Sequence, residues 1–140
     1  MSRFCWSARV YWEDTDGGGV VYYANYLRFL ERARTEWLRA RGLSQQALVA
    51  DHHILFTVVG LNIEYRRPAR LDDTLLVTCE PQAEGAASVS FAQGVYRAQV
   101  EEGDLLASAQ VRIACVDART FRPQRLPDFL VNALNAQEQA

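Results

Sequence analysis

The sequence predicts an α+β domain in which one antiparallel β-sheet wraps around a long helix. A helical pattern of apolar residues runs through residues 26–40, and its wide apolar stripe requires cover on more than one side. After residue 50 the period changes, and alternating apolar and polar residues indicate four long strands. Short turns separate these strands, and strands joined by short turns pair in an antiparallel manner.

The elements before the sheet begin with a short strand predicted over residues 8–12. Three glycines at residues 17–19 then form a turn directly before the long helix. Gly42 follows that helix at the position where glycine commonly ends one. The apolar residues of the helix recur at three- and four-residue spacing. They are Tyr26, Phe29, Leu30, Ala33, Trp37 and Ala40.

The second half of the chain starts with a shorter helix, which Ser44 is expected to cap and which should reach about residue 50. Turn signals at Pro68 with Asp72 and Asp73, at Glu84-Gly85 and at residues 102–104 divide the rest into strands. The predicted strands are residues 59–66, 74–80, 88–100 and 105–116. A short terminal helix is expected around Leu126, Phe129, Leu130 and Leu134.

The order of these elements is strand, long helix, short helix and four strands, and the hotdog fold is the best-known form of that α+β architecture. We find no internal repeat, low-complexity tract or linker, so we predict a single hotdog domain over residues 1–140. Its antiparallel sheet should wrap around the long central helix. A cystatin-like or cone-shaped α+β roll is the alternative fold.

Composition excludes several classes of protein. The chain is 49% hydrophobic, which is enough for a substantial core, and its net charge of −2 argues against binding to nucleic acid. The N-terminus has no apolar segment typical of a secretory signal. The longest apolar run, residues 54–63, is too short for a membrane span of about 20 residues. We therefore expect a soluble, cytoplasmic protein.

Common catalytic and metal-binding patterns are absent from the sequence. There is no G-x-S-x-G motif and no phosphate-binding loop. His52 and His53 are adjacent, so on a strand they would point to opposite faces and could not bind one metal ion. Cys5, Cys79 and Cys115 are widely spaced and form no C-x-x-C pair. We expect structural roles for the cysteines, structural or solvent-exposed roles for the histidines, no metal site and no cofactor.

One segment could support catalysis. Residues 13–16, with the sequence Glu-Asp-Thr-Asp, lead directly into the glycine turn and the long helix. The first N–H groups of a helix lack partners and carry partial positive charge, so they can stabilise an oxyanion. A carboxylate beside them could attack a carbonyl or activate a water molecule. A capped turn without catalytic function explains the same residues, so spacing alone leaves both interpretations open.

The sequence around this segment resembles a known family. Residues 9–26 (R-V-Y-W-E-D-T-D-G-G-G-V-V-Y-Y-A-N-Y) are similar to the N-terminal signature of the 4-hydroxybenzoyl-CoA thioesterase family. The similarity is strongest to its YbgC branch, acyl-CoA thioesterases associated with the Tol-Pal system. It continues in order through residues 31–36 (E-R-A-R-T-E), 44–48 (S-Q-Q-A-L) and 68–73 (P-A-R-L-D-D). The resemblance thus covers most of the chain and implies the hotdog fold.

The resemblance also implies an acyl-CoA thioesterase and its catalytic residues. The catalytic aspartate of the family precedes the small-residue turn, which here makes it Asp16, with Asp14 as the weaker candidate. The backbone N–H that polarises the carbonyl falls on Tyr23. Many members of the branch have histidine there, so only the main-chain role is carried over. Whether Asp16 attacks the carbonyl or acts as a general base stays open.

Substrate contacts are expected from the turn and from one arginine. They would involve Gly18, Gly19 and Val20, because glycine allows close approach of the backbone to a ligand. Arg70 could bind the phosphates of coenzyme A, as could Arg66 and Arg67. A solvated turn explains these arginines equally well. For Arg70, an ion pair with Asp72 or Asp73 is an equally good explanation.

The expected partners are acyl-CoA, with acyl-carrier protein as an alternative, and further copies of the chain. Long strands would leave exposed sheet edges, so we expect a homodimer or homotetramer. The resemblance places the active site at the dimer interface and suggests association with Tol-Pal envelope machinery. It does not say whether Asp16 and Tyr23 act from one subunit or two. Phe56, Val58 and Phe91 are candidates to line the pocket and favour an acyl group over a polar one. Among the acyl groups that the family hydrolyses we favour an aliphatic one.

Two other functions are considered. A hotdog dehydratase or hydratase acting on acyl-carrier-protein substrates would need a catalytic histidine near an acid, and the two histidines lie far from residue 16 in the sequence. A non-catalytic acyl-CoA or acyl-carrier binder, or a scaffold at the cell envelope, would share the fold without turnover.

Overall fold

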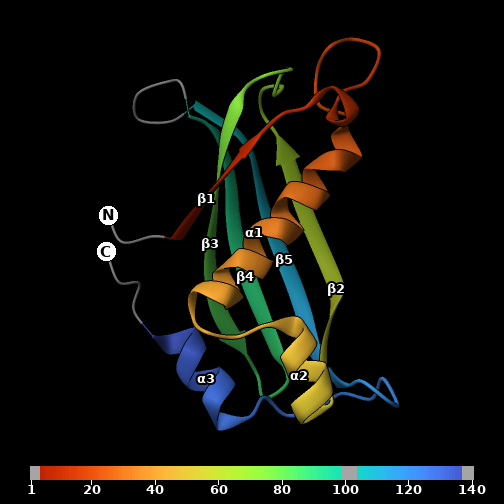
Figure 1. Ribbon diagram of the computed structural model, residues 1–140, viewed down its shortest axis with the longest axis vertical. Coiled ribbons are helices and arrows are strands. Elements are labelled where there is room, and N and C mark those ends of the chain that lie inside the picture. The colour runs from red at the N-terminus through yellow and green to blue at the C-terminus, as the bar shows by residue number, and fades with distance from the viewer. Residues whose placement is uncertain (1–3, 99–103, 137–140) are drawn as a thin grey trace.

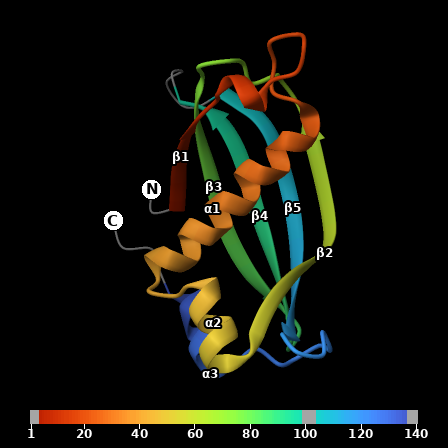
Figure 2. The same cartoon turned by 45° about the vertical axis from the view of Figure 1, so that its right-hand side comes forward.

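An antiparallel sheet of five strands wraps around helix α1 (Tyr26–Ala40) in the computed structural model, which describes residues 4–98 and 104–136. Helices α2 (Gln45–His52) and α3 (Asp128–Asn135) lie together at one end of the sheet, and α1 runs diagonally across one face (Figures 1 and 2). The strands are β1 (Phe4–Arg9), β2 (Ile54–Tyr65), β3 (Thr74–Glu84), β4 (Ser88–Arg97) and β5 (Asp104–Asp117). The predicted α+β architecture is confirmed.

Helix α1 forms because its apolar residues fall on one face that the sheet can cover. Its buried residues are Tyr26, Phe29, Leu30, Ala33, Trp37 and Leu38. Leu38 therefore completes the stripe, whereas Ala40, which the sequence placed there, is exposed. The Trp37 ring meets the Phe91 ring of β4 edge-on, with 5.4 Å between centroids. Gly42 ends the helix with a φ of 77°, as predicted.

The N-terminal strand lies earlier than the sequence predicted. β1 pairs with β3 from Phe4 opposite Cys79 to Arg9 opposite Thr74, and residues 12–14 form the short 3₁₀ helix η1 (Trp12–Asp14) instead of strand. The Asp14 carboxylate accepts a hydrogen bond from the Tyr11 N–H at 2.8 Å. This local side-chain bond competes with strand geometry. Residues 8 and 9 of the predicted strand therefore lie in β1, whereas its extension through residue 12 is wrong.

The shorter helix and the strand ends also follow local chemistry. The Ser44 hydroxyl oxygen accepts a hydrogen bond from the Ala47 N–H at 3.1 Å and caps α2 as expected. β3 continues past the predicted end at residue 80 because β4 pairs with it as far as Glu84, which lies opposite Ser88. Residues 99–103 lie outside the described residues. They include the end of the strand predicted over residues 88–100 and most of the turn expected at residues 102–104.

The strand order is β1-β3-β4-β5-β2, so only part of the predicted series of hairpins is correct. β3, β4 and β5 are successive hairpins. β2 instead pairs with β5, from Ile54 opposite Asp117 to Tyr65 opposite Ala107. The chain then crosses the end of the sheet through residues 66–73 before β3 begins. β3 has β1 and β4 on its two sides, so β2 must take the free edge of β5.

A β-bulge in β2 decides which of its side chains face α1. Val58 lies opposite Ile113 and Gly60 opposite Arg112, which leaves Val59 as the extra residue. The phase of the strand changes there, so Val58 and Leu61 both share a face with buried residues of β5. Because the bulge interrupts the alternation of apolar and polar residues, the sequence predicted only the part of β2 from residue 59 onward, whereas the strand begins at Ile54.

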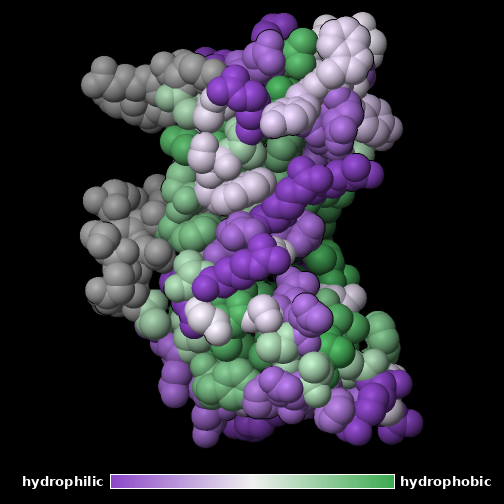
Figure 3. Space-filling view, viewed as in Figure 1, coloured by the Kyte–Doolittle hydropathy of each residue, from purple (hydrophilic) through white to green (hydrophobic). Residues whose placement is uncertain are grey.

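The concave face of β2 is only partly covered by α1. Val58, Leu61 and Tyr65 are 51%, 45% and 44% exposed. Apolar side chains accordingly gather at the surface on the side of the molecule where β2 lies (Figure 3). Among the described residues, no helix is long and apolar enough to cross a membrane.

Candidate active site

A tight hairpin presents Asp16 beside the start of the long helical segment. Thr15 pairs with Val21, and the Asp16 N–H donates to the Val20 carbonyl at 2.9 Å. Gly19 has a φ of 79°, a left-handed conformation that glycine adopts without steric cost. The short 3₁₀ helix η2 (Tyr23–Asn25) follows two residues after Val21 and leads into α1. The loop carrying Asp16 and the helix start lie together at the end of the molecule opposite α2 and α3 (Figure 1).

The Asp16 carboxylate is exposed and held by one hydrogen bond. Its Oδ1 accepts from the Gly18 N–H at 2.7 Å. A Cβ atom on Gly18 would lie 3.3 Å from this oxygen, so a side chain there would crowd the carboxylate. Within the described part of the chain, Oδ2 makes no hydrogen bond. One oxygen therefore orients the group while the other can meet water or a ligand.

Asp14 has a different role. It is 7% exposed, and both of its carboxylate oxygens accept hydrogen bonds at 2.8 Å, one from the Tyr11 N–H and one from the Asn25 side-chain amide. Its carbonyl oxygen also accepts from the Tyr22 N–H. Asp14 thus ties η1 to η2 and supports the hairpin, while Asp16 is the aspartate of this segment that solvent can reach.

Tyr23 begins η2, where a backbone N–H has no partner inside the helix. Its carbonyl oxygen accepts a hydrogen bond from the Tyr65 hydroxyl at 2.7 Å. Partial burial raises the pKa of the Tyr65 phenol, which favours this donating form. The Tyr23 ring is exposed and lies 5.0 Å from the Tyr22 ring. The contact fixes the helix start against the C-terminal end of β2.

The structure brings the predicted substrate-binding residues together. Val20 pairs with Arg70, and the Leu71 N–H donates to the Gly19 carbonyl at 3.4 Å. The Val21 N–H also donates to the Ala69 carbonyl at 2.8 Å. Residues 68–73 therefore back the glycine turn, and Gly18, Gly19, Val20 and Arg70 occupy one cluster of loops beside Asp16.

The three candidate arginines differ in their surroundings. Arg67 pairs with Asp104 at 3.0 Å, and Arg66 lies 3.6 Å from Glu64. Arg70 is exposed and makes no ion pair within the described residues; its backbone N–H, not its guanidinium, bonds to Asp73. The guanidinium of Arg70 is thus the one of the three that can meet a phosphate without breaking an ion pair.

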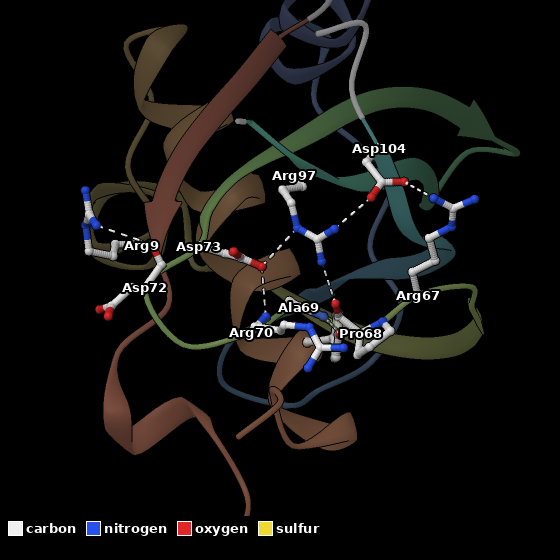
Figure 4. A network of polar contacts seen from close by, with 10 residues as sticks. Arg9, Arg67, Pro68, Ala69, Arg70, Asp72, Asp73, Arg97 and Asp104 are labelled. Carbon is white, nitrogen blue, oxygen red and sulfur yellow. Dashed lines mark hydrogen bonds and ion pairs between the residues drawn. The ribbon is translucent and has the colours of Figure 1, made fainter. Parts of the chain in front are cut away.

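Arg97, at the end of β4, was missed by the sequence analysis and organises this loop (Figure 4). Its guanidinium donates to Asp73 at 3.1 Å, to Asp104 at 2.7 Å and to the Pro68 carbonyl at 2.7 Å. One side chain thus joins residues 68–73 to the end of β4 and the start of β5. In the sequence, Arg97 is recognisable only as an arginine within a predicted strand. That position does not identify the residues to which it bonds.

The two histidines lie at the end of helix α2 and not on a strand. His52 ends α2, and His53 follows as its cap with a φ of 55°, so the expectation of opposite strand faces is wrong. The left-handed cap turns the chain between helix and β2. The His52 ring packs 4.7 Å from the Phe129 ring, near α3. These are the sequence's two histidines, and both lie at the opposite end of the molecule from Asp16.

Cys79 and Cys115 are buried, as expected for structural cysteines, whereas Cys5 is exposed. Burial raises the pKa of the Cys79 thiol to about 12, and burial also raises that of Cys115. Both thiols are therefore protonated and poor nucleophiles at neutral pH. Among the described residues, no group of three or more histidine, cysteine or acidic side chains is arranged to hold a metal ion.

A cavity of about 210 Å³ lies between the C-terminal half of α1, the sheet and α3. Its lining is mostly apolar and includes Phe56, Val58 and Phe91, the residues proposed from the sequence to contact an acyl group. Arg34 also lines it and donates to the buried Gln93 side chain at 2.9 Å. Burial lowers the pKa of Arg34.

Comparison with known proteins assigns the family. The sequence matches the thioesterase-like superfamily over residues 10–134. The chain belongs to this superfamily. It is 46% identical over 128 residues to the acyl-CoA thioester hydrolase YbgC of Escherichia coli O6:H1, covering 91% of this chain and 92% of that protein. It is 43% identical over 124 residues to the acyl-CoA thioesterase YbgC of Haemophilus influenzae, covering 89% and 88%.

Solved structures support the same assignment. A 1,4-dihydroxy-2-naphthoyl-CoA thioesterase from Synechocystis, Slr0204, superimposes with a TM-score of 0.86 at 29% identity and covers 94% of each chain. The probable thioesterase YbaW from Escherichia coli gives a TM-score of 0.80 at 30% identity, covering 97% of this chain and 99% of its own. The predicted hotdog fold and the resemblance to the YbgC branch are therefore confirmed.

Proposed function

We propose that this protein is an acyl-CoA thioesterase that hydrolyses the thioester to a free carboxylic acid and coenzyme A, with Asp16 as the catalytic carboxylate. The YbgC relatives, at 43–46% identity, carry this activity in their names. The observation that carries the assignment to Asp16 is geometric. It is an exposed carboxylate oriented by Gly18 at the turn before the helix, whereas Asp14 is buried with both oxygens bonded.

The chemistry needs a polarised carbonyl and an oxygen nucleophile. The backbone N–H of Tyr23 would donate to the thioester carbonyl as negative charge develops on its oxygen. In one route Asp16 attacks the carbonyl carbon and coenzyme A leaves as a thiolate, after which water hydrolyses the mixed anhydride. In the other route Asp16 takes a proton from water, which attacks directly. Both routes break the C–S bond and consume one water.

Binding of coenzyme A would involve the loop cluster around the glycine turn. The backbone of Gly18, Gly19 and Val20 can approach a ligand closely. The Arg70 guanidinium, which makes no ion pair with any described residue, would meet phosphate oxygens through paired donors. A thioester presented by an acyl-carrier protein is the alternative substrate.

A homodimer would complete this site. The free edge of β2 carries exposed apolar side chains on its concave face, and an unpaired edge of this kind favours pairing with another strand. Antiparallel pairing of two β2 strands would align the Tyr65 end of one with the Phe56 end of the other. Because Tyr65 bonds to Tyr23 and Phe56 lines the cavity, Asp16 of one subunit would face its partner's cavity. Two such dimers would form a homotetramer.

Light scattering at micromolar concentration tests this assembly. We expect particles of two or four chains, and a particle of only 15.8 kDa would contradict an interfacial site. The resemblance to the YbgC branch further supports a cytoplasmic enzyme associated with Tol-Pal envelope machinery.

Replacing Asp16 by asparagine tests the catalytic assignment. Asparagine keeps Oδ1 as acceptor for the Gly18 N–H, so the free energy of unfolding should change by less than about 1 kcal/mol. Loss of the charge should lower kcat on the best acyl-CoA by about 10²–10⁴. Glu13→Gln, an exposed acid in the same segment, is the matched control and should keep near-normal kcat.

Measured turnover decides between the proposed enzyme and a non-catalytic acyl binder. Turnover of Asp16→Asn within threefold of the wild type, in a folded protein, would show that Asp16 is not the catalyst. A wild-type protein that binds acyl-CoA without hydrolysing any member of a broad panel would support the binder.

A further inference from the structure

The cavity under α1 is divided into a polar mouth and an apolar base. The exposed side chains that border it are Glu31, Gln45 and Val58, which mark the opening on the side of β2. The Val89 and Phe91 side chains, at most 3% exposed, lie at its inner end. A ligand with one polar end and an apolar tail fits this arrangement, since the tail would leave water at the base.

The Arg34 guanidinium in the wall of the cavity is compatible with an apolar ligand tail, because its charge is bonded to the protein. The Arg34 guanidinium donates to the Gln93 side-chain oxygen at 2.9 Å, and the Gln93 amide in turn donates to the Leu30 carbonyl at 3.1 Å. The guanidinium is thus bonded to the wall of the cavity. Glu31, at the mouth, accepts a hydrogen bond from the Thr35 hydroxyl at 2.6 Å.

Helix α3 closes one side of the cavity. Leu130, Ala133 and Leu134 lie on one helical face because their spacing is three and four residues, and all three line the cavity. Arg41 holds the helix in place: its Nε donates to the Ala133 carbonyl at 3.1 Å, and its guanidinium stacks 4.0 Å from the Trp37 ring centroid. Helix α3, tied by Arg41 to the chain just after α1, therefore forms part of the wall.

We propose that this cavity receives the acyl chain of the substrate and that α3 sets the preferred length at about eight carbons. The proposal rests on the acyl-CoA thioesterase function and on the dimer proposed above, in which Asp16 of one subunit faces its partner's cavity. An apolar cavity of about 150 Å³ accepts benzene, which corresponds to about 25 Å³ per carbon. The observed volume of about 210 Å³ then accommodates about eight carbons. The substrate class is a saturated acyl-CoA of medium length.

Two substitutions with opposite effects on volume test the role of α3. Leu134→Ala removes three side-chain carbons from the wall and should move the optimum of kcat/KM to chains roughly two to four carbons longer. Ala133→Leu adds three carbons and should move it in the other direction. Val131→Ala, a half-buried residue of the same helix that is not among those lining the cavity, should leave the optimum unchanged.

The measurement uses saturated acyl-CoAs of increasing length, together with melting curves to show that each variant is folded. Affinities for alkyl-CoA thioethers of the same lengths, which contain no scissile thioester carbonyl, provide a readout independent of turnover. Opposite shifts in the two variants support the proposal, because general damage to the fold would move both in the same way. If Ala133→Leu does not fold, the shift in Leu134→Ala alone decides the outcome.

Failure of this inference can be distinguished from failure of the proposed function. Hydrolysis that depends on Asp16, with chain-length profiles unchanged in a folded Leu134→Ala, would show that the acyl group binds elsewhere. Thioether affinities that shift as expected, without hydrolysis of any acyl-CoA, would support the cavity and refute the enzyme. A wild-type preference for benzoyl-type thioesters over every aliphatic chain would overturn the proposed substrate class.

Discussion

Replacing Arg97 by methionine should destabilise the loop that backs the glycine turn. The Arg97 guanidinium is shared by the Asp73 and Asp104 carboxylates and the Pro68 carbonyl, at 2.7–3.1 Å. Methionine has an unbranched stem but no donor. Two carboxylates would lose this cation, and the Pro68 carbonyl would lose the guanidinium that fixes it.

The size of the effect follows from burial. The side chains of Arg97, Asp73 and Asp104 are 20%, 17% and 14% exposed. Fully buried pairs cost about 3–5 kcal/mol when one partner is removed, and exposed pairs contribute about 0–1 kcal/mol. We expect an intermediate loss of about 2–3 kcal/mol in the free energy of unfolding. For a chain of this length that corresponds to a fall in Tm of roughly 6–12 °C.

The assay combines thermal unfolding with amide hydrogen exchange at equal protein concentrations, since oligomerisation would raise Tm. The Val21 N–H, which donates to the Ala69 carbonyl, should exchange faster in Arg97→Met. The matched control is Arg112→Met in β5, because Arg112 lies 3.6 Å from Glu84 and both side chains are exposed. The reasoning is refuted if Arg97→Met is no more destabilising than this control.

Two substitutions, a thiol reagent and a change of pH test other parts of the structure. Ser44→Ala removes the cap of α2 and should cost about 1 kcal/mol in urea unfolding, with Ser44→Thr losing much less. Tyr26→Phe leaves the buried Ala69 N–H without its acceptor at 3.0 Å and should cost about 1–3 kcal/mol by the same measurement; an unchanged midpoint would show that water replaces the hydroxyl. A disulfide reagent at neutral pH should modify the exposed Cys5 quickly and Cys79 only on unfolding. Burial raises the pKa of the Cys79 thiol to about 12, so this thiol stays protonated in the folded state at pH values where an unfolded thiol, above pH 9, ionises. The contribution of Cys79 to the free energy of unfolding should therefore decline as the pH rises from 9 towards 12.

Local pattern was sufficient for most of the elements and for the candidate catalytic segment. Helix α1 matches its predicted range because its apolar spacing is long and regular, and Ser44 and Gly42 act as the cap and stop their chemistry predicts. The position of Asp16 before the glycine turn could also be recognised directly in the sequence. Whether Asp16 is the catalyst stays a prediction.

Errors in local structure arose where a short-range contact changed the backbone. The Asp14 carboxylate draws residues 12–14 into a 3₁₀ turn, which a two-residue alternation does not reveal. The bulge at Val59 reverses the phase of β2 and concealed the first half of that strand. In both places one hydrogen bond or one extra residue outweighs intrinsic strand preference.

The sequence by itself determined the family, the helix and the identity of the candidate acid, because these depend on residues close together in the chain. Only the tertiary structure decided that β2 pairs with β5, that Asp14 is buried while Asp16 is exposed, and that Arg97 joins the loop of residues 68–73 to the ends of β4 and β5. The cavity beneath α1 also required the fold, since α3 reaches it from the other end of the chain. Such features depend on contacts between residues far apart in sequence, which no local periodicity encodes.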